Sequence, residues 1–177
     1  MRAMSNEAKI TTKEATANPL ARALTHIFER EIIEVCDNEP LLLRWKIATR
    51  PTFQVYLHWF VRDDHEREMH SHPFDFVSII LWRGYVEERP TPRIRAILST
   101  GDVAACDPST PSERKRIVPG SILRRPAWWA HRVLLVDGKP SWSLVVRSAK
   151  KAEWGFFTKN GWIWWRDWCN IRICGEE

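Results

Sequence analysis

The chain has 177 residues, of which 44% are hydrophobic, enough to bury the core of one domain but too few for two full domains. No run approaches the roughly 18 apolar residues that span a bilayer, and the N-terminal residues lack the apolar core of a signal peptide. We therefore expect a cytoplasmic protein with no membrane partner. The formal net charge of +5 favours anionic partners in general.

The cysteines show no Cys-x-x-Cys spacing, which argues against both a zinc knuckle and a disulfide framework. We expect them to be reduced thiols. They are Cys36, Cys106, Cys169 and Cys174.

Residues 1–17 are polar and lack an apolar period, which is typical of a flexible tail. From Asn18 onward apolar residues recur every three or four positions, with Asn18 as the expected N-cap and Pro19 at the first helical position. This spacing predicts an amphipathic helix over residues 18–38. The helix should cover an open end or an outer face of the domain that follows.

Residues 39–177 are predicted to form a single β domain, with strands at 41–47, 53–62, 76–82, 114–118 and a hairpin of 131–136 with 141–148. The second of these strands alternates, and both of its faces are partly apolar, as expected when another layer covers the outside of the sheet. Residues 87–112 contain several prolines and are predicted to be irregular, with one possible strand at 94–98.

The C-terminal segment, residues 153–168, holds five of the eleven tryptophans. The favoured interpretation is that they cover the outer surface of the domain or form a dimer interface. The alternative is an aromatic and basic surface that stacks nucleotide bases or sugars, made by Trp162, Trp165, Arg166 and Lys159.

Three histidines carry the main functional signal. His70 and His72 are two positions apart, so on a strand their side chains point to the same face. His131 lies just after a proline-marked turn and could supply a third imidazole. Three neutral imidazoles bind divalent ions such as Fe, Zn, Ni, Cu, Co and Mn and leave coordination positions open. His65 is a rival ligand, but it lies in a charged loop.

These residues give the chain a resemblance to the cupin superfamily, which covers residues 56–147. In the first cupin motif His70, His72 and Gly84 match, while Val77 stands where the family has Glu. In the second motif Gly120, Pro126 and His131 match, whereas Trp128 replaces a Gly and Leu135 stands where an Asn is often found.

The resemblance implies a small antiparallel β-barrel, or jelly roll, with a mononuclear metal bound by His70, His72 and His131. A three-histidine set resembles that of the thiol dioxygenases, which implies Fe(II) and an oxygenase acting on a small polar or anionic molecule, with Zn, Ni or Mn as other metals. A metal-dependent sugar isomerase or epimerase would use the same site. A non-catalytic module that binds a ligand, a partner or nucleic acid also remains open, and dimers are common in the superfamily.

Further side chains are candidates for the same site. Asp75 could bind the metal, accept a hydrogen bond from a ligand histidine, or simply cap a turn; we expect the hydrogen bond. The candidates for substrate binding are arginines that could anchor a carboxylate or phosphate, together with two residues that could line the pocket. They are Arg62, Arg124, Arg147, Tyr56 and His58.

Overall fold

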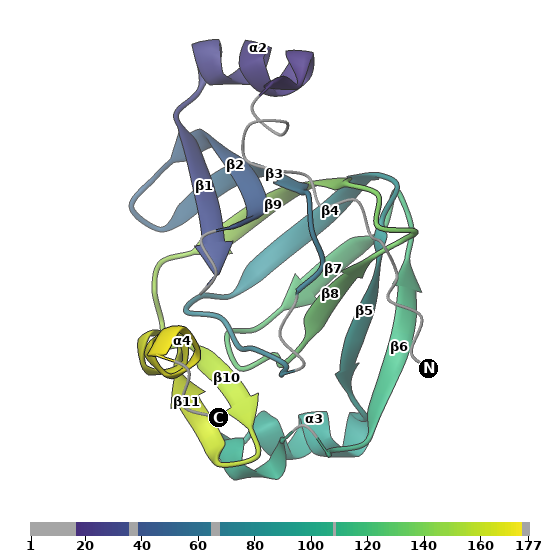
Figure 1. Ribbon diagram of the computed structural model, residues 1–177, viewed down its shortest axis with the longest axis vertical. Coiled ribbons are helices and arrows are strands. Elements are labelled where there is room, and N and C mark those ends of the chain that lie inside the picture. Colours follow the sequence, from purple (N-terminus) through teal and green to yellow (C-terminus); the bar gives the residue numbers. More distant parts are fainter. Residues whose placement is uncertain (1–16, 36–38, 65–67, 108, 175–177) are drawn as a thin grey trace.

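The computed structural model describes residues 17–35, 39–64, 68–107 and 109–174, except for the side chains of 35, 39, 105 and 171–174. Strands predominate within these ranges, and the paired strands are antiparallel (Figure 1). The expectation of a mainly β fold is confirmed. No helix in the described ranges has the length and apolar character needed to cross a bilayer.

The helices lie near the two ends of the chain and in its middle, and strands fill the stretches between them. The helices are α2 (Pro19–Ile27), α3 (Pro92–Leu98), the 3-10 helix η1 (Val103–Ala105) and α4 (Trp165–Cys174). The strands are β1 (Arg30–Val35), β2 (Glu39–Thr49), β3 (Phe53–Phe60), β4 (Phe76–Trp82), β5 (Tyr85–Pro90), β6 (Ser112–Ile117), β7 (Ile122–Arg125), β8 (Arg132–Leu135), β9 (Ser141–Ser148), β10 (Gly155–Thr158) and β11 (Gly161–Trp164).

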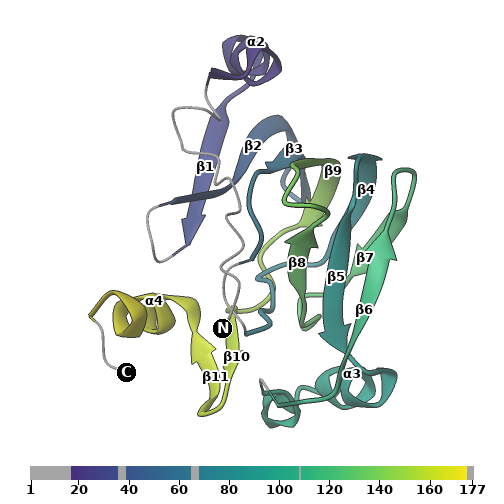
Figure 2. The ribbon, with the colours of Figure 1, turned by 45° about the vertical axis from the view of Figure 1, so that its right-hand side comes forward.

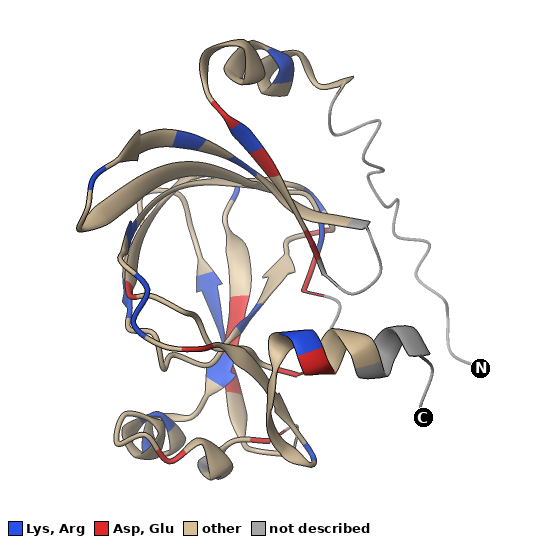
Figure 3. Cartoon of the chain, turned by 90° about the vertical axis from the view of Figure 1, so that its left-hand side faces the viewer, with Lys and Arg blue, Asp and Glu red and all other residues tan. Residues whose placement is uncertain are grey.

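Two sheets pack against each other in a jelly-roll arrangement. A six-stranded sheet has the order β1-β2-β3-β9-β4-β7, a three-stranded sheet has the order β6-β5-β8, and β10 and β11 form a separate hairpin. Figure 3 shows these strands curving around a common interior. Ile80 and Leu123 of the larger sheet form one buried cluster with Tyr85, Ile117 and Val133 of the smaller sheet. This cluster closes one side of the interior.

Register decides which side chains of the larger sheet face that interior. In the β3–β9 pair Tyr56 lies opposite Val145 and His58 lies opposite Ser143. Directly opposed residues of antiparallel strands share a face, and these residues share the inner one. Trp59, which alternates with them, belongs to a buried cluster on the outer face.

The N-terminal helix covers this outer face. The Oδ1 atom of Asn18 accepts hydrogen bonds from the N–H groups of Leu20 at 3.0 Å and Ala21 at 3.2 Å, so Asn18 is the N-cap, as predicted. Ala21 is fully buried against a stack in which Trp142 lies between Trp45 and Trp59, with ring centroids 5.5 and 5.3 Å apart. Figure 2 shows α2 on the far side of the sheet from β5 and β8.

The helix is shorter than predicted. It ends at Ile27, and residues Arg30–Val35 form β1, which pairs with β2. The apolar spacing over 27–35 suits a helix, but Ile32, Ile33 and Val35 are β-branched and have the free edge of β2 to pair with, so sheet pairing prevails.

The predicted irregular region also differs. Residues 85–90 form β5, the central strand of the smaller sheet, and residues 92–98 form α3 instead of a strand. Pro92 at the start of α3 supplies the helical φ angle, and Ile94 and Leu98 are one helical turn apart, so both residues can face the buried cluster that contains Met69.

The C-terminal segment ends in the helix α4, although residues 39–177 were expected to form a β domain. Within it Phe156 and Phe157 are buried, and Trp154 stacks on Trp165 of α4 with ring centroids 5.5 Å apart. Cys169 is disulfide-bonded, which corrects the expectation of reduced thiols at this position. Its partner lies outside the described side chains, whereas Cys106 is a free, buried thiol.

Candidate metal centre

The three histidines meet where two distant segments pair. His70 and His131 form an antiparallel bridge, with the His70 N–H donating to the His131 carbonyl at 2.9 Å and the reverse bond at 3.1 Å. The three rings have centroids 4.9 to 5.2 Å apart. Ligand nitrogens of His70, His72 and His131 all lie within 4.8 Å of one another. The sequence therefore identified a real convergence of imidazoles.

The protonation states of these rings suit metal binding. Burial lowers the pKa of His70 to about 4, with the carboxylate of Asp64 acting in the opposite direction. Burial, together with the neighbouring rings of His131 and His70, lowers the pKa of His72 well below its usual value. Both imidazoles are therefore neutral at pH 7, the form that offers a lone pair to a cation.

A buried carboxylate orients His131. Glu87 of β5 has no exposed surface, and its Oε1 atom lies 2.9 Å from Nδ1 of His131. Arg125 holds the same carboxylate in a bidentate pair, with Nε–Oε1 at 2.8 Å and Nη2–Oε2 at 2.6 Å. Burial alone would raise the pKa of Glu87, but hydrogen bonds from His131 and Arg125 outweigh it and lower the pKa. The carboxylate is therefore charged.

This charge decides which nitrogen of His131 is free. Because Glu87 can only accept a hydrogen bond, Nδ1 of His131 must carry a proton, so in the neutral ring Nε2 holds the lone pair. That Nε2 lies 2.8 Å from Nε2 of His72, which can then donate to it. For both Nε2 atoms to hold a metal ion, His72 would have to give up this proton, so that each ring presents a lone pair.

The spread of the ligand atoms is close to what a small divalent ion requires. Two nitrogens that each lie about 2.1 Å from one ion can be no more than about 4.2 Å apart. The three ring nitrogens lie within 4.8 Å of one another, so the rings would have to move slightly closer for all three to reach one ion. The donor set, three neutral imidazoles, is typical of borderline metals such as iron, zinc or nickel.

Asp75 does not have the role expected of it. Its Oδ1 atom accepts the N–H of Ala127 at 2.9 Å, and its Oδ2 atom pairs with Lys151 at 2.7 Å. It therefore braces the loop before His131, and Glu87 accepts the hydrogen bond from the histidine. The rival ligand His65 lies outside the described residues.

Sequence reasoning missed Glu87 because the prolines that follow it made its segment look irregular. The signal was the alternation Tyr85-Val86-Glu87, with the first and third residues facing the interior. Val77, at the position where the cupin motif has Glu, pairs with Val146 and with the exposed Arg124, so it lies on the outer face of β4.

A cavity of about 360 Å³ adjoins the three histidines. Most of its lining is apolar or aromatic, and the polar groups are a few arginines, His58, Asp64, Tyr85 and two serines. Trp154 and Phe156 of the C-terminal segment line it, and Phe156 also forms a β-bridge with His70. Trp154 therefore lies at the site, whereas the favoured interpretation had placed the C-terminal tryptophans on the outer surface or at a dimer interface. Among the residues that the larger sheet contributes to the lining are Phe60, Phe76, Ser78, Ser143, Val145 and Arg147.

The predicted substrate-binding residues divide into two groups. Arg62, His58 and Arg147 line the cavity. The ring of Tyr56 is buried beside it, and its hydroxyl donates to Gln54 and accepts from Arg147.

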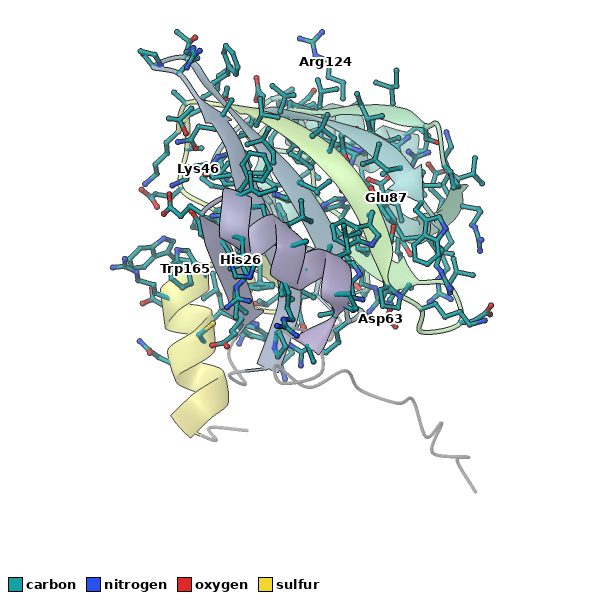
Figure 4. All side chains as sticks on the ribbon, turned by 90° about the horizontal axis from the view of Figure 1, so that it is seen from above. His26, Lys46, Asp63, Glu87, Arg124 and Trp165 are labelled. Carbon is teal, nitrogen blue, oxygen red and sulfur yellow. The ribbon has the colours of Figure 1, made fainter. Side chains whose placement is uncertain are left out.

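The prediction that Arg124 binds substrate in the cavity is wrong. It is exposed on the outer face of β7, where Figure 4 shows it pointing away from the sheets. Its neighbour Arg125 points inward instead, because successive residues of a strand alternate between faces.

No family model matches the chain, and no curated protein matches it. Solved structures do. A cupin-2 domain protein from Rhodospirillum rubrum is 11% identical, with a TM-score of 0.51 over 75% of this chain and 77% of that one. A polyketide cyclase from Streptomyces resistomycificus is 13% identical, with a TM-score of 0.50 over 73% of this chain and 79% of that one. The chain therefore has the fold of the cupin superfamily.

Proposed function

We propose that the chain is a metal-dependent enzyme, an oxygenase that holds Fe(II) with His70, His72 and His131 and acts on a small polar or anionic molecule. The observation that carries the proposal is the convergence of three imidazoles at the wall of a cavity. A purely structural histidine cluster would not need such a cavity beside it.

The residues of the chain have defined tasks in this proposal. His70, His72 and His131 present ring nitrogens to the metal, and Glu87 holds a proton of His131 on Nδ1, away from the metal. The aromatic lining excludes bulk water from the reacting groups. A bound Fe(II) ion would supply redox chemistry with O₂, and three protein ligands leave positions for other ligands.

A Lewis-acid enzyme, such as a sugar isomerase or epimerase, is the second candidate. It is favoured by the donor set, because no carboxylate of the described residues belongs to the group of ligands, and three imidazoles would leave the ion its full charge. Consumption of O₂ during turnover separates the two candidates, since an isomerase needs none.

The first experiment is elemental analysis of protein purified without a histidine tag. We expect close to one metal ion per chain, and we expect His72→Ala and His131→Ala to lose it. His26→Ala is the matched control, because His26 is exposed on α2. Wild-type metal content in the two site variants would contradict the proposal.

A second experiment tests for open coordination positions. Fe(II)-loaded protein is treated with nitric oxide without air, and EPR spectra are recorded. An open site should give the half-integer-spin signal of an iron–nitrosyl complex, and a saturated site should give none. Absence of the signal from protein that contains iron would overturn the oxygenase assignment.

A further inference from the structure

Arg147 lines the cavity, and its hydrogen-bond partners among the described residues are neutral. Its Nε atom donates to Oε1 of Gln54 at 2.8 Å, and its Nη2 atom donates to Gln54 and to the hydroxyl of Tyr56. The guanidinium lies between two rings, 4.9 Å from the centroid of Tyr56 and 4.4 Å from that of Phe74. These contacts fix its position without neutralising its charge.

Two other arginines around the interior have acidic partners. Arg44 donates to Glu31 at 2.7 Å, and Arg125 is held by Glu87. Within the described residues no carboxylate forms an ion pair with Arg147, and its Nη1 atom has no hydrogen-bond partner there. A cation placed in this way at a mainly apolar cavity is suited to an anionic ligand.

Two further polar atoms in the lining of the same cavity also point to a ligand. Ser143 is 1% exposed, and its Oγ atom has no hydrogen-bond partner among the described residues. The same holds for Nε2 of His58, which lies directly across from Ser143 in the β3–β9 pair. Both residues line the cavity. Buried polar atoms are rarely left without a hydrogen bond, so a polar group of a ligand in the cavity could form a hydrogen bond with each of them.

The remaining lining sets the shape of the ligand. Phe60, Phe74, Phe76, Trp154 and Phe156 line the same cavity as the arginine and the histidines. A volume of about 360 Å³ is at the small end for ligand pockets. The site therefore suits a small molecule with one charged end and a flat apolar body.

We propose that the substrate is a small carboxylate with an aromatic or similarly flat apolar body. Its carboxylate binds to Arg147, and a hydroxyl or other polar substituent binds to Ser143 and His58. That this ligand is a substrate rests on the proposed function. That it binds at Arg147 is argued from the contacts of Arg147, Ser143 and His58 alone. It adds Ser143, which the sequence did not single out.

The test measures the binding of benzoate to metal-free protein by calorimetry. We expect Arg147→Gln to raise the Kd at least about tenfold, because a charge-assisted hydrogen bond is lost. Arg124 lies exposed on the outer face of β7, so Arg124→Gln should leave the Kd unchanged. Benzamide, which has the same shape but no charge, should bind wild-type protein as weakly as benzoate binds Arg147→Gln. Equal Kd values for benzoate in wild type and Arg147→Gln would overturn the proposal.

Two further arms refine the ligand class. Phenyl phosphate should bind less tightly than benzoate, since a single guanidinium serves the subsite; tighter binding of the phosphate would overturn the carboxylate assignment. Ser143→Ala should abolish any preference for 3-hydroxybenzoate over benzoate without weakening benzoate itself. If the wild type shows no such preference for any of the three hydroxybenzoate isomers, the role of Ser143 is wrong.

The two proposals can fail separately. His72→Ala should lose metal yet bind benzoate through Arg147, whereas Arg147→Gln should keep its metal. If benzoate binds only to metal-loaded protein and ignores Arg147, the subsite is wrong and the metal centre stands. If metal never binds but benzoate binding depends on Arg147, the subsite stands and the enzyme assignment is wrong.

Discussion

The Oε1 atom of Glu87 lies 2.9 Å from Nδ1 of His131, so a carboxylate on β5 fixes the tautomer of a candidate metal ligand just before β8. The same carboxylate is bidentate to Arg125 and accepts a weaker bond from Trp129 at 3.3 Å. The carboxylate thus accepts hydrogen bonds from several partners. Removing its charge should lower the free energy of unfolding substantially, because these partners would be left buried without it.

Glu87→Gln should weaken metal binding about 10- to 100-fold, because the ring of His131 loses the anion that orients it. It should also destabilise the fold by about 3 to 5 kcal/mol, since Arg125 is left buried without its counter-charge. Competition with a chelator measures the affinity, and urea denaturation measures the stability.

Glu88→Gln is the control for this change. Glu88 is the next residue of β5, and it pairs with Arg132 and Arg114 on the opposite face. We expect wild-type metal affinity and a smaller loss of stability than in Glu87→Gln, because Glu88 and Arg132 keep some contact with solvent whereas Glu87 has none. Folded Glu87→Gln protein with wild-type metal affinity would show that Glu87 has no role in the site.

Metal binding should raise the thermal stability of the protein. A ligand at a hundred times its Kd adds about 2.7 kcal/mol to the free energy of unfolding, which corresponds to roughly 5 to 10 °C in Tm for a chain of this size. Calorimetry with and without a chelator measures the shift. His131→Ala should show none, while His26→Ala should behave as wild type. An unchanged Tm at saturating Fe(II), Zn(II) and Ni(II) would argue against a metal site.

Much of this site was readable from residue types in order. His70, His72 and His131 were identified because a His-x-His pair, followed later by a His after a proline turn, can be recognised from the order of the residues alone. Glu87 and Ser143 were not, because a partner across the sheet depends on register, which no local pattern encodes. Arg124 was favoured over Arg125 because the phase of a four-residue strand cannot be fixed from so few side chains.

The fold shows the same division between local and long-range information. The N-cap at Asn18 was predicted correctly, since it depends on a side chain bonding to the next turn. The end of that helix was not, because β1 exists only as a partner of β2. Residues 94–98 were predicted as a possible strand but belong to a helix, because the proline at position 92 starts a helix there.

The stability of the protein should fall between pH 6.5 and pH 3, in part because of His58. Burial lowers the pKa of His58 to about 3, and the charges of Arg44 and Arg147 add to this effect. In this pH range the unfolded chain binds a proton that the folded chain does not, so the free energy of unfolding decreases as the pH falls. One such group contributes a slope of about 1.4 kcal/mol per pH unit.

His58→Gln should remove that contribution and make the decline shallower. The measurement is urea denaturation at a series of pH values with a chelator present, so that metal binding does not enter. His26→Gln, which alters an exposed histidine, should keep the wild-type slope. If His58→Gln and wild type show parallel pH profiles, His58 is protonated in the fold and its surroundings have been misjudged.

The two glycines of the cupin motifs should differ sharply in their tolerance of a side chain. Gly84 has φ +76° and follows Arg83 with φ +62°, the pattern of a tight hairpin turn between β4 and β5. A Cβ at Gly84 would lie 2.0 Å from the carbonyl oxygen of Ile117, which is backbone of β6 and cannot rotate away. Gly120 has φ +85°, but a Cβ there would meet nothing within 4 Å.

Gly120→Ala should therefore cost only the strain of a left-handed backbone, about 1 to 2 kcal/mol. Gly84→Ala carries the same strain and must also push β6 away from β5, so its loss should be clearly larger. Because β5 holds Glu87 and pairs with β8, which follows His131, this displacement should weaken metal binding as well. Urea midpoints and chelator competition on both variants measure the two effects. Equal losses of stability in the two variants would mean that β6 yields to the added methyl group, and that the contact at Gly84 does not constrain the smaller sheet.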